Sequence, residues 1–316
     1  MSSLARKENT GLDLTGKSAA VAGGTGGIGE AVGLRFAQAG ADVYIIGRSR
    51  EKGTRVVEEL KRHGGQGKTF EFIQADLSSL TEVKRVADEL KAKTGSKGID
   101  YLVQTQGGPP NGDYTLTSTT PPHDFHFAVQ TLSRFGLAYF LASSGTLKEA
   151  WVNVLSPGGA SGAEPDVEDL ELEKEEHRKK WLLGRVIGQG AQDGALGDAM
   201  VAHFPRAFPH LKAYHLFPGF VPTGAMRSSN LLPSPLTWAA ELAGPILARI
   251  LPFGNLPSQY AEIPVYVAAN PASKGKGLEF SNQGLKALGM PRWAEQEDGK
   301  AKGVWEKLKG IVEKEA

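Results

Sequence analysis

The sequence predicts an α/β fold in a single domain, a Rossmann-type, doubly wound parallel sheet with helices on both faces. Short apolar runs bounded by glycine or polar residues alternate with longer segments of helical periodicity. The first run, 19–22, enters a glycine-rich turn at 23–29 that leads directly into a helix, and a second run follows at 43–47. This order of strand, turn, helix and strand is the context in which a glycine-rich turn holds a phosphate.

The remaining elements continue the alternation. Five further strands are expected, at 70–75, 99–103, 150–156, 211–216 and 277–282. The helix after the second strand is expected to end near 60. Further helices are expected at 83–90, 125–141, 236–251 and 262–269, with a short charged helix at 305–311. These elements divide the domain into a core at about 14–284, an insert at 157–190, a helical substrate lid at 224–258 and a helical tail at 285–316.

Composition excludes several classes of function. The 316 residues carry 36 basic and 35 acidic side chains, so no nucleic acid partner is expected. The absence of cysteine excludes disulfides and zinc-thiolate sites, and no metal site is expected. The polar N-terminus has no signal-peptide core and no apolar run is long enough to span a bilayer, which predicts a cytoplasmic protein. Contact of 236–251 with a membrane surface is not expected, because Arg249 is its only basic residue.

Three glycines determine the geometry of the first turn. Gly23 can adopt the dihedrals of a tight turn, Gly27 lets the backbone approach a pyrophosphate, and Gly29 lets the helix lie close to the strand. Their spacing resembles the cofactor turn of the short-chain dehydrogenase/reductase family, although Ala22 stands where that family usually has threonine. The resemblance implies a sheet order of 3-2-1-4-5-6-7 and a nicotinamide dinucleotide contacted by Gly23, Thr25, Gly27, Ile28 and Gly29.

The end of the second strand favours NADP(H) as the cofactor. The position that reads the ribose, about twenty residues after the turn, holds Arg48 and then Ser49, with no acidic residue. An arginine would bind a 2′-phosphate through a charge-assisted fork, whereas a carboxylate would repel it. The alternative is that Arg48 only begins the solvated face of the helix that follows.

Two further positions match the family's cofactor site. The pair Asp76–Leu77 follows the third strand, and the resemblance implies that Asp76 accepts a hydrogen bond from the adenine amino group. The alternative is that Asp76 caps the next helix, and both roles can coexist. Gly107 keeps the closing glycine after the fourth strand, although the amides before it are changed, and this implies that backbone approaches the cofactor ribose there.

The segment after the sixth strand resembles the family's Pro-Gly-x-Val-x-Thr motif. The matching residues are Pro218, Gly219, Val221 and Thr223. In the family the valine backbone meets the nicotinamide amide, and the threonine bonds that amide or the pyrophosphate. Proline and glycine alone would indicate only a turn. Together with the glycine turn, the segment predicts that the nicotinamide half of the pocket is kept.

The catalytic candidates begin with Ser156 and Gln130. Ser156 ends the fifth strand in the place of the family's catalytic serine, which orients the substrate carbonyl; the alternative is an ordinary turn serine. Gln130 matches an asparagine that steadies a proton-relay water in the family; the alternative is an exposed helical glutamine. The same helix often packs against its copy in a partner subunit of family members, so the resemblance is compatible with a homodimer.

The family's Tyr-x-x-x-Lys dyad is missing. No tyrosine lies between Tyr139 and Tyr214, and no lysine lies between Lys180 and Lys212. The earliest register puts Trp181 and Arg185 in the two places, and later registers put Ala191 and Ala195 there. A positioned general acid contributes roughly 10²–10⁴ in rate, and neither indole nor alanine supplies one.

Hydride transfer to a carbonyl would therefore need another proton donor. Histidine is the side chain type best suited to proton transfer near neutral pH, so His177 is the first candidate in the insert, and Arg185 is another; the alternative is that His177 is a solvated member of a charged run. Asp193 and Asp198 are expected near the mouth of the site.

Two functions remain open. One is an NADP(H)-dependent oxidoreductase acting on a hydrophobic carbonyl or alcohol, and the layout is most similar to the retinol-dehydrogenase and protochlorophyllide-reductase branch. The other is a non-redox catalyst (isomerase, dehydratase or cyclase) or a cofactor-binding protein without enzyme activity on the same fold.

Overall fold

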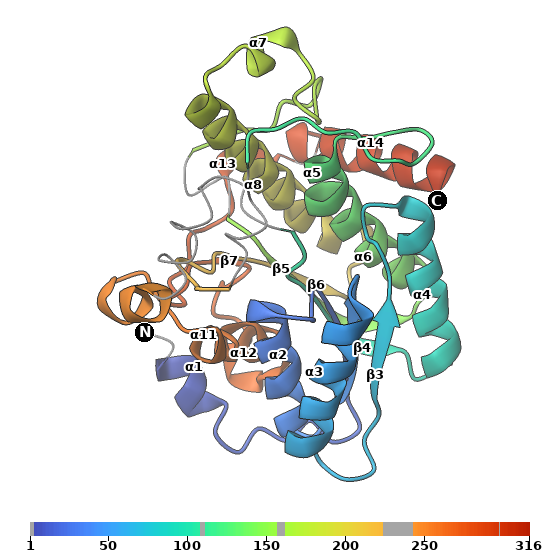
Figure 1. Ribbon diagram of the computed structural model, residues 1–316, viewed down its shortest axis with the longest axis vertical. Coiled ribbons are helices and arrows are strands. Elements are labelled where there is room, and N and C mark those ends of the chain that lie inside the picture. Colours follow the sequence, from blue (N-terminus) through green and yellow to red (C-terminus); the bar gives the residue numbers. More distant parts are fainter. Residues whose placement is uncertain (1–2, 108–110, 157–161, 224–242, 297) are drawn as a thin grey trace.

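A computed structural model of the chain describes residues 3–107, 111–156, 162–223, 243–296 and 298–316. Its centre is a seven-stranded parallel sheet of order β3-β2-β1-β4-β5-β6-β7, which confirms the predicted fold class and strand order (Figure 1). The strands are β1 (Ser18–Ala22), β2 (Asp42–Gly47), β3 (Phe70–Gln74), β4 (Ile99–Gln104), β5 (Leu147–Val154), β6 (Lys212–Leu216) and β7 (Phe280–Ser281).

The central strands are apolar because both faces of the sheet are covered. Every residue of β1 and of β4 is buried, which is the pattern expected of parallel strands between two helical layers. Two predicted boundaries are wrong. The strand expected at 277–282 is only the two residues of β7, and β5 ends at Val154, two residues before Ser156.

The helices form two layers, each with its own hydrophobic cluster. One face carries α1 (Ser3–Glu8), α2 (Gly27–Gln38), α3 (Arg50–His63), α11 (Pro257–Tyr260) and α12 (Glu262–Ala269). The other carries α4 (Leu80–Thr94), α5 (Phe125–Phe127), η1 (Ala128–Leu132), α6 (Ser133–Ser143), α8 (Leu182–Ala207), α13 (Arg292–Glu295) and α14 (Lys300–Glu315). The structure also contains the short helices α7 (Glu175–Arg178) and η3 (Pro271–Ser273).

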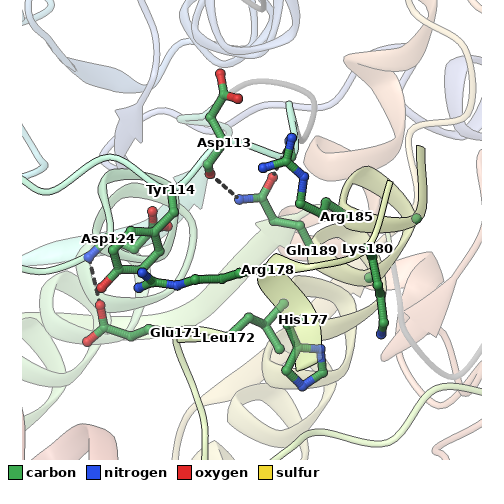
Figure 2. A pocket seen from close by; sticks show the side chains of 13 residues that line it. Asp113, Tyr114, Asp124, Glu171, Leu172, His177, Arg178, Lys180, Arg185 and Gln189 are labelled. Atoms are coloured by element: carbon green, nitrogen blue, oxygen red, sulfur yellow. Dashed lines mark hydrogen bonds between the residues drawn. The ribbon is translucent and has the colours of Figure 1, made fainter. Parts of the chain in front are cut away.

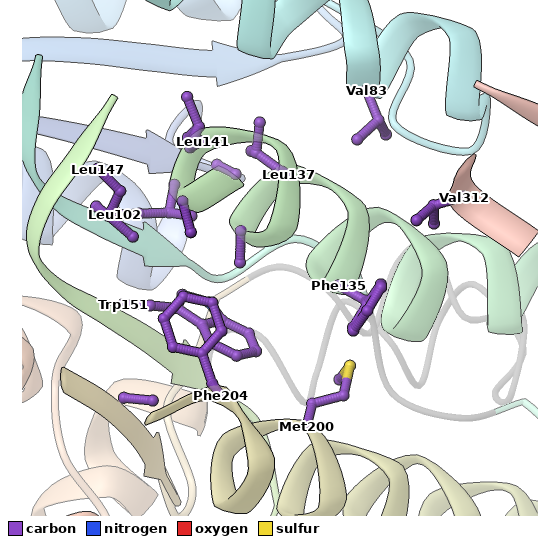
Figure 3. Close-up of a cluster of buried hydrophobic side chains, with 14 of the residues drawn as sticks. Val83, Leu102, Phe135, Leu137, Leu141, Leu147, Trp151, Met200, Phe204 and Val312 are labelled. Atoms are coloured by element: carbon purple, nitrogen blue, oxygen red, sulfur yellow. The ribbon is translucent and has the colours of Figure 1, made fainter. Parts of the chain in front are cut away.

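Aliphatic and aromatic side chains pack together in the second of these layers (Figure 3). The rings of Trp151 and Phe204 are 4.9 Å apart, and Trp305 of α14 lies edge-on to Phe135 at the same distance. The indole Nε1 of Trp151 donates to Oε1 of Gln104 at 2.6 Å, so the one polar atom of this buried ring is satisfied. The layer thereby fixes α6 and α8 against β4 and β5.

Three helix predictions need correction. The helix expected at 125–141 is divided by a π-helical turn, η1, and a turn of this kind often marks a functional site. The tail is a 16-residue helix with a buried face, where a short charged helix at 305–311 was predicted. The chain is helical at 243–250, while the rest of the helix predicted at 236–251 lies outside the described residues. Most of the predicted lid, 224–242, and residues 157–161 of the insert also lie outside them.

No helix in the described ranges combines the length and apolar character needed to cross a membrane. The helix from 243 to 250 instead exposes large apolar side chains at its surface, those of Ile246, Leu247 and Ile250.

Candidate functional site

The glycine turn has the geometry that its sequence predicts. Gly23 and Gly27 have φ values of +76° and +55°, a region that other residues rarely adopt. A Cβ on Gly29 would lie 2.4 Å from the carbonyl oxygen of Gly23 and 2.5 Å from Oγ1 of Thr105. Only glycine therefore lets the start of α2 pack this closely against the ends of β1 and β4.

The glycine turn and the Pro218 segment meet in space although they lie at opposite ends of the chain. A Cβ on Gly27 would come within 2.8 Å of the Cβ of Thr223. Gly219 has a φ of +66°, and a Cβ on it would lie 2.3 Å from the carbonyl oxygen of Phe253, so only glycine fits at this position. Thr25 packs against Gly47 at the end of β2. The predicted cofactor residues from three strand ends thus surround one place.

The ribose-reading position holds two exposed arginines steadied by a glutamine. Gln74, at the end of β3, donates to the backbone oxygen of Arg48 at 3.0 Å and accepts from Nε of Arg50 at 3.1 Å. Ser49 caps α3 by accepting from the amide of Lys52 at 3.3 Å. Among the described residues the side chain of Arg48 has no hydrogen-bond or ion-pair partner, so its guanidinium faces solvent.

Asp76 is not the cap of the next helix. Its Oδ1 accepts from the amide and the hydroxyl of Ser78, at 3.0 and 2.9 Å, and Ser79 caps α4 instead. The carboxylate is exposed at the carboxyl edge of the sheet, while Leu77 is buried in the core. The capping alternative for Asp76 is therefore wrong, and the side chain has no structural role in α4.

A buried arginine, Arg134 of α6, joins the ends of β4 and β5. Its guanidinium donates to five oxygen atoms, the carbonyls of Gln104, Gln106 and Val154 and the side chains of Asn153 and Gln130. Burial lowers the pKa of Arg134 to about 9 against the opposing attraction of Asp193, so the group still carries its charge at neutral pH. One cation thus replaces the hydrogen bonds that these strand ends would make with water.

Gln130 lies inside this cluster. Its side chain is buried, so the alternative of an exposed helical glutamine is wrong. The Oε1 of Gln130 accepts from Arg134 at 3.2 Å, and a Cβ on Gly107 would meet its amide group at 2.4 to 2.5 Å. Ser156 lies two residues beyond Val154, with an exposed side chain. Gly107 and Ser156 therefore follow the neighbouring ends of β4 and β5, and Gln130 of η1 packs against the first of them.

A charged pair formed by His126 and Asp193 lies beside Arg134. The Nε2 of His126 lies 2.5 Å from Oδ2 of Asp193, which connects the start of the divided helix to α8. Burial lowers the pKa of His126, but the carboxylate of Asp193 outweighs this and leaves the pKa raised.

Neither predicted register for the missing dyad contains Asp193. Trp181 instead lies at the N-cap of α8 with its side chain 71% exposed, and Ala195 is fully buried.

The predicted donors His177 and Arg185 line a different cavity (Figure 2). This cavity measures about 50 Å³, and Ser156 is not among the described residues that line it. Arg178 extends across it to lie 3.6 Å over the ring of Tyr114. Within the described part of the chain, Nε2 of His177 and Nε of Arg185 are buried without a hydrogen-bond partner. The structure brings these two candidates together, but apart from the cluster around Arg134.

Comparison with known proteins agrees with this architecture. Residues 17–136 match the family model described as short chain dehydrogenase. The chain is 26% identical to an uncharacterized oxidoreductase of Saccharomyces cerevisiae, over 90% of its own length and 85% of that protein. It is 27% identical to one of Mycobacterium tuberculosis, over 84% and 91%.

Other matches are shorter or concern the fold. The chain is 39% identical to a 3beta-hydroxysteroid dehydrogenase of Mediterraneibacter gnavus, but over only 28% of its length and 30% of that enzyme. A crystal structure of a short chain dehydrogenase from Burkholderia cenocepacia in complex with NADP superposes with a TM-score of 0.58 at 19% identity, covering 90% of this chain and 99% of that one. Through the family model over residues 17–136 and the full-length relatives the chain is similar to the short-chain dehydrogenase/reductase family, and it shares the fold of the solved short chain dehydrogenase.

Proposed function

We propose that the protein is an NADP(H)-dependent oxidoreductase that interconverts a hydrophobic carbonyl compound and its alcohol, using a non-standard proton donor. The observation that carries this proposal is the meeting of Gly27 with Thr223, because the two motifs would hold opposite parts of one dinucleotide. The solved relatives include enzymes crystallised with NADP and NADPH, which supports the choice of cofactor.

The residues of the turn fit a pyrophosphate. The N-cap of α2 is Gly26, which has no side chain, so the first amide groups of the helix are free to bind an anion. A Cβ on Gly26 would meet nothing within 4 Å, so space is open in front of these amides. Arg48, exposed at the end of β2, would bind the 2′-phosphate. The backbone of Val221 and the hydroxyl of Thr223 would hold the nicotinamide end.

The proposed substrate lies beside Ser156. When bound, NADPH supplies the hydride that reduces the carbonyl carbon. Ser156 would donate its hydroxyl proton in a hydrogen bond to the substrate oxygen and so orient it, while Gln130 would steady the backbone of the neighbouring strand end. Apolar side chains exposed between 243 and 253, those of Ile246, Ile250 and Phe253, support a hydrophobic substrate. We assign this segment to the lid.

Titration with NADPH and NADH tests the cofactor. We expect NADPH to quench the intrinsic tryptophan fluorescence and to bind more tightly than NADH. Arg48→Ala should weaken NADPH by roughly tenfold and leave NADH unchanged. Arg62→Ala is the matched control, since Arg62 lies at the far end of α3 and pairs with Glu59. Equal affinity for the two coenzymes, or tighter NADH, would refute the assignment of NADP(H).

The second candidate is a non-redox catalyst or a cofactor-binding protein on the same fold. The missing dyad favours it, since neither Trp181 nor Ala191 donates a proton. A panel of ketones and alcohols followed by the absorbance of NADPH separates the two functions. Binding of NADPH without any oxidation, across the panel, would support the second candidate and exclude the first.

A further inference from the structure

The pair formed by His126 and Asp193 is built into the fold and has no role in the functions assigned so far. Its two side chains are 13% and 8% exposed, and the 2.5 Å contact crosses from the divided helix to α8. The two residues are 67 positions apart in sequence. A buried charged pair costs desolvation free energy, so it is weak evidence for added stability, and its perturbed ionisable groups make it a candidate for a functional site.

The pair lies next to the ends of β4 and β5. Arg134 is close enough to Asp193 for the carboxylate to oppose the fall in the pKa of the guanidinium. That guanidinium donates to the carbonyl of Val154, two residues before Ser156, and to the carbonyl of Gln106, the residue before Gly107. Gln130, one helical turn after His126, contacts Gly107 directly. Arg134 and Gln130 therefore link the charged pair to both strand ends that border the proposed substrate.

The charges around His126 favour its protonated form. Burial disfavours the imidazolium and Arg134 repels it, while Asp193 on α8 and Asp124 on the preceding turn attract it, and the net effect is a raised pKa. Because Nε2 is engaged with Asp193, the proton on Nδ1 is the one that can be given to another group. The carboxylate of Asp193 thus orients the imidazole and helps to raise its pKa.

We propose that His126 is the proton donor that replaces the missing tyrosine, and that Asp193 is the residue that positions it. This inference rests on the proposed oxidoreductase function. In the reductive direction the Nδ1–H bond of His126 breaks and an O–H bond forms on the substrate oxygen as the carbonyl carbon is reduced. The neutral imidazole then regains a proton from solvent; in the oxidative direction the same nitrogen accepts the proton.

His177 is less suited to this role. It faces Asp166 and Glu176 at 3.9 and 3.7 Å in the charged run of the insert, and it lines the cavity of Figure 2. None of the hydrogen bonds of the Arg134 cluster reaches it. Asp166 is half-buried and Glu176 is exposed, and neither carboxylate hydrogen-bonds to Nε2 of His177 in the described part of the chain.

Three variants of the full-length protein test the inference: His126→Gln, Asp193→Asn and, as control, His123→Gln. His123 lies one turn away and also contacts carboxylates, but these belong to the insert and to α14. The probes are NADPH with phenanthrenequinone and with a medium-chain aliphatic ketone. We expect His126→Gln to bind NADPH within threefold of the wild type and to lose roughly 100- to 10,000-fold in kcat. Asp193→Asn should move the alkaline limb of the kcat profile to lower pH, and His123→Gln should leave kcat and that limb unchanged.

A readout independent of turnover is the titration of His126 by nitrogen-15 NMR, with and without NADP⁺. We expect the pKa of His126 to fall in Asp193→Asn and to change when NADP⁺ binds to the wild type. Full turnover by His126→Gln with an unaltered pH profile would overturn the inference, as would a His126 resonance that NADP⁺ does not affect. If the wild type binds neither coenzyme, the proposed function itself fails, and the tests of His126 are not what refutes it.

Discussion

Nη1 of Arg134 lies 2.5 Å from Oδ1 of Asn153, a contact between two buried side chains that links α6 to β5. No carboxylate hydrogen-bonds to the guanidinium within the described ranges, so its charge is stabilised by oxygen dipoles, with Asp193 acting at longer range. Asn153 also faces His215 in the register of β5 and β6. The ends of β4 and β5 therefore depend on neutral acceptors around one cation.

Asn153→Leu should destabilise the protein, because it removes an acceptor from a buried cation without removing the charge. We expect a loss of about 1–3 kcal/mol in the free energy of unfolding, measured by urea denaturation. Asn153→Asp keeps an acceptor and adds a counter charge, so it should lose less than the leucine variant. A leucine variant as stable as the wild type would show that the contact contributes nothing.

Two glycines of the cofactor turn make a matched pair. Gly29→Ala forces a methyl group to within 2.5 Å of backbone and of Thr105, and we expect a loss of roughly 1–3 kcal/mol in stability. Gly26→Ala introduces the same methyl group into open space at a φ of −177°, which any residue adopts. Its urea denaturation midpoint should equal that of the wild type. It should nonetheless weaken NADPH, because the methyl group enters the space in front of the first amides of α2. Equal stability of the two variants would contradict the packing described for Gly29.

Local signals account for the parts of the fold that the sequence predicts well. The continuous apolar strands and the glycine spacing determine which segments pair, and the meeting of Gly27 with Thr223 follows once the strand order is known. The cluster around Arg134 does not follow from such signals. An arginine within a helix is normally expected on the face exposed to solvent. The acceptors of Arg134 include carbonyl groups at strand ends, and no sequence pattern identifies such groups. Asp193 is expected near the mouth of the site, but its contact with His126 depends on the packing of α8, and the insert obscures the register of that helix.

His123 should make stability depend on pH. It contacts Glu171 of the insert and Glu315 of α14, both at 2.8 Å, and the hydrogen bond with Glu171 is the main reason that its pKa is raised to about 9. A raised pKa in the folded state means that the contribution is complete below about pH 6.5 and disappears as the pH rises to about 9. The loss over this range should reach at most about 3 kcal/mol.

The measurement compares wild type and His123→Gln by urea denaturation at several pH values. Other groups titrate in both proteins, so the difference between them isolates His123. We expect the difference to be largest near pH 6 and to shrink toward pH 9. A difference that stays constant across this range would show that the two glutamates do not raise the pKa of His123.

Trp305 should anchor α14 to the body of the domain. Its indole is 3% exposed and lies 4.9 Å from the ring of Phe135 and 5.0 Å from that of His203, so it contacts both α6 and α8. Trp305→Ala leaves a large cavity and should cost about 3–5 kcal/mol of stability. Trp181→Ala is the matched control: its side chain is 71% exposed, and the expected change is within about 0.5 kcal/mol.

The same variant also tests the homodimer that the family resemblance allows. Because α14 packs on the helix proposed to meet a partner subunit, loosening it should uncover Phe135 and Tyr139 and promote self-association. Sedimentation velocity of Trp305→Ala should then show larger species than the wild type at equal concentration. If both proteins sediment alike while the variant is destabilised, α14 serves stability alone, and a dimer through this helix would have to form with α14 in place.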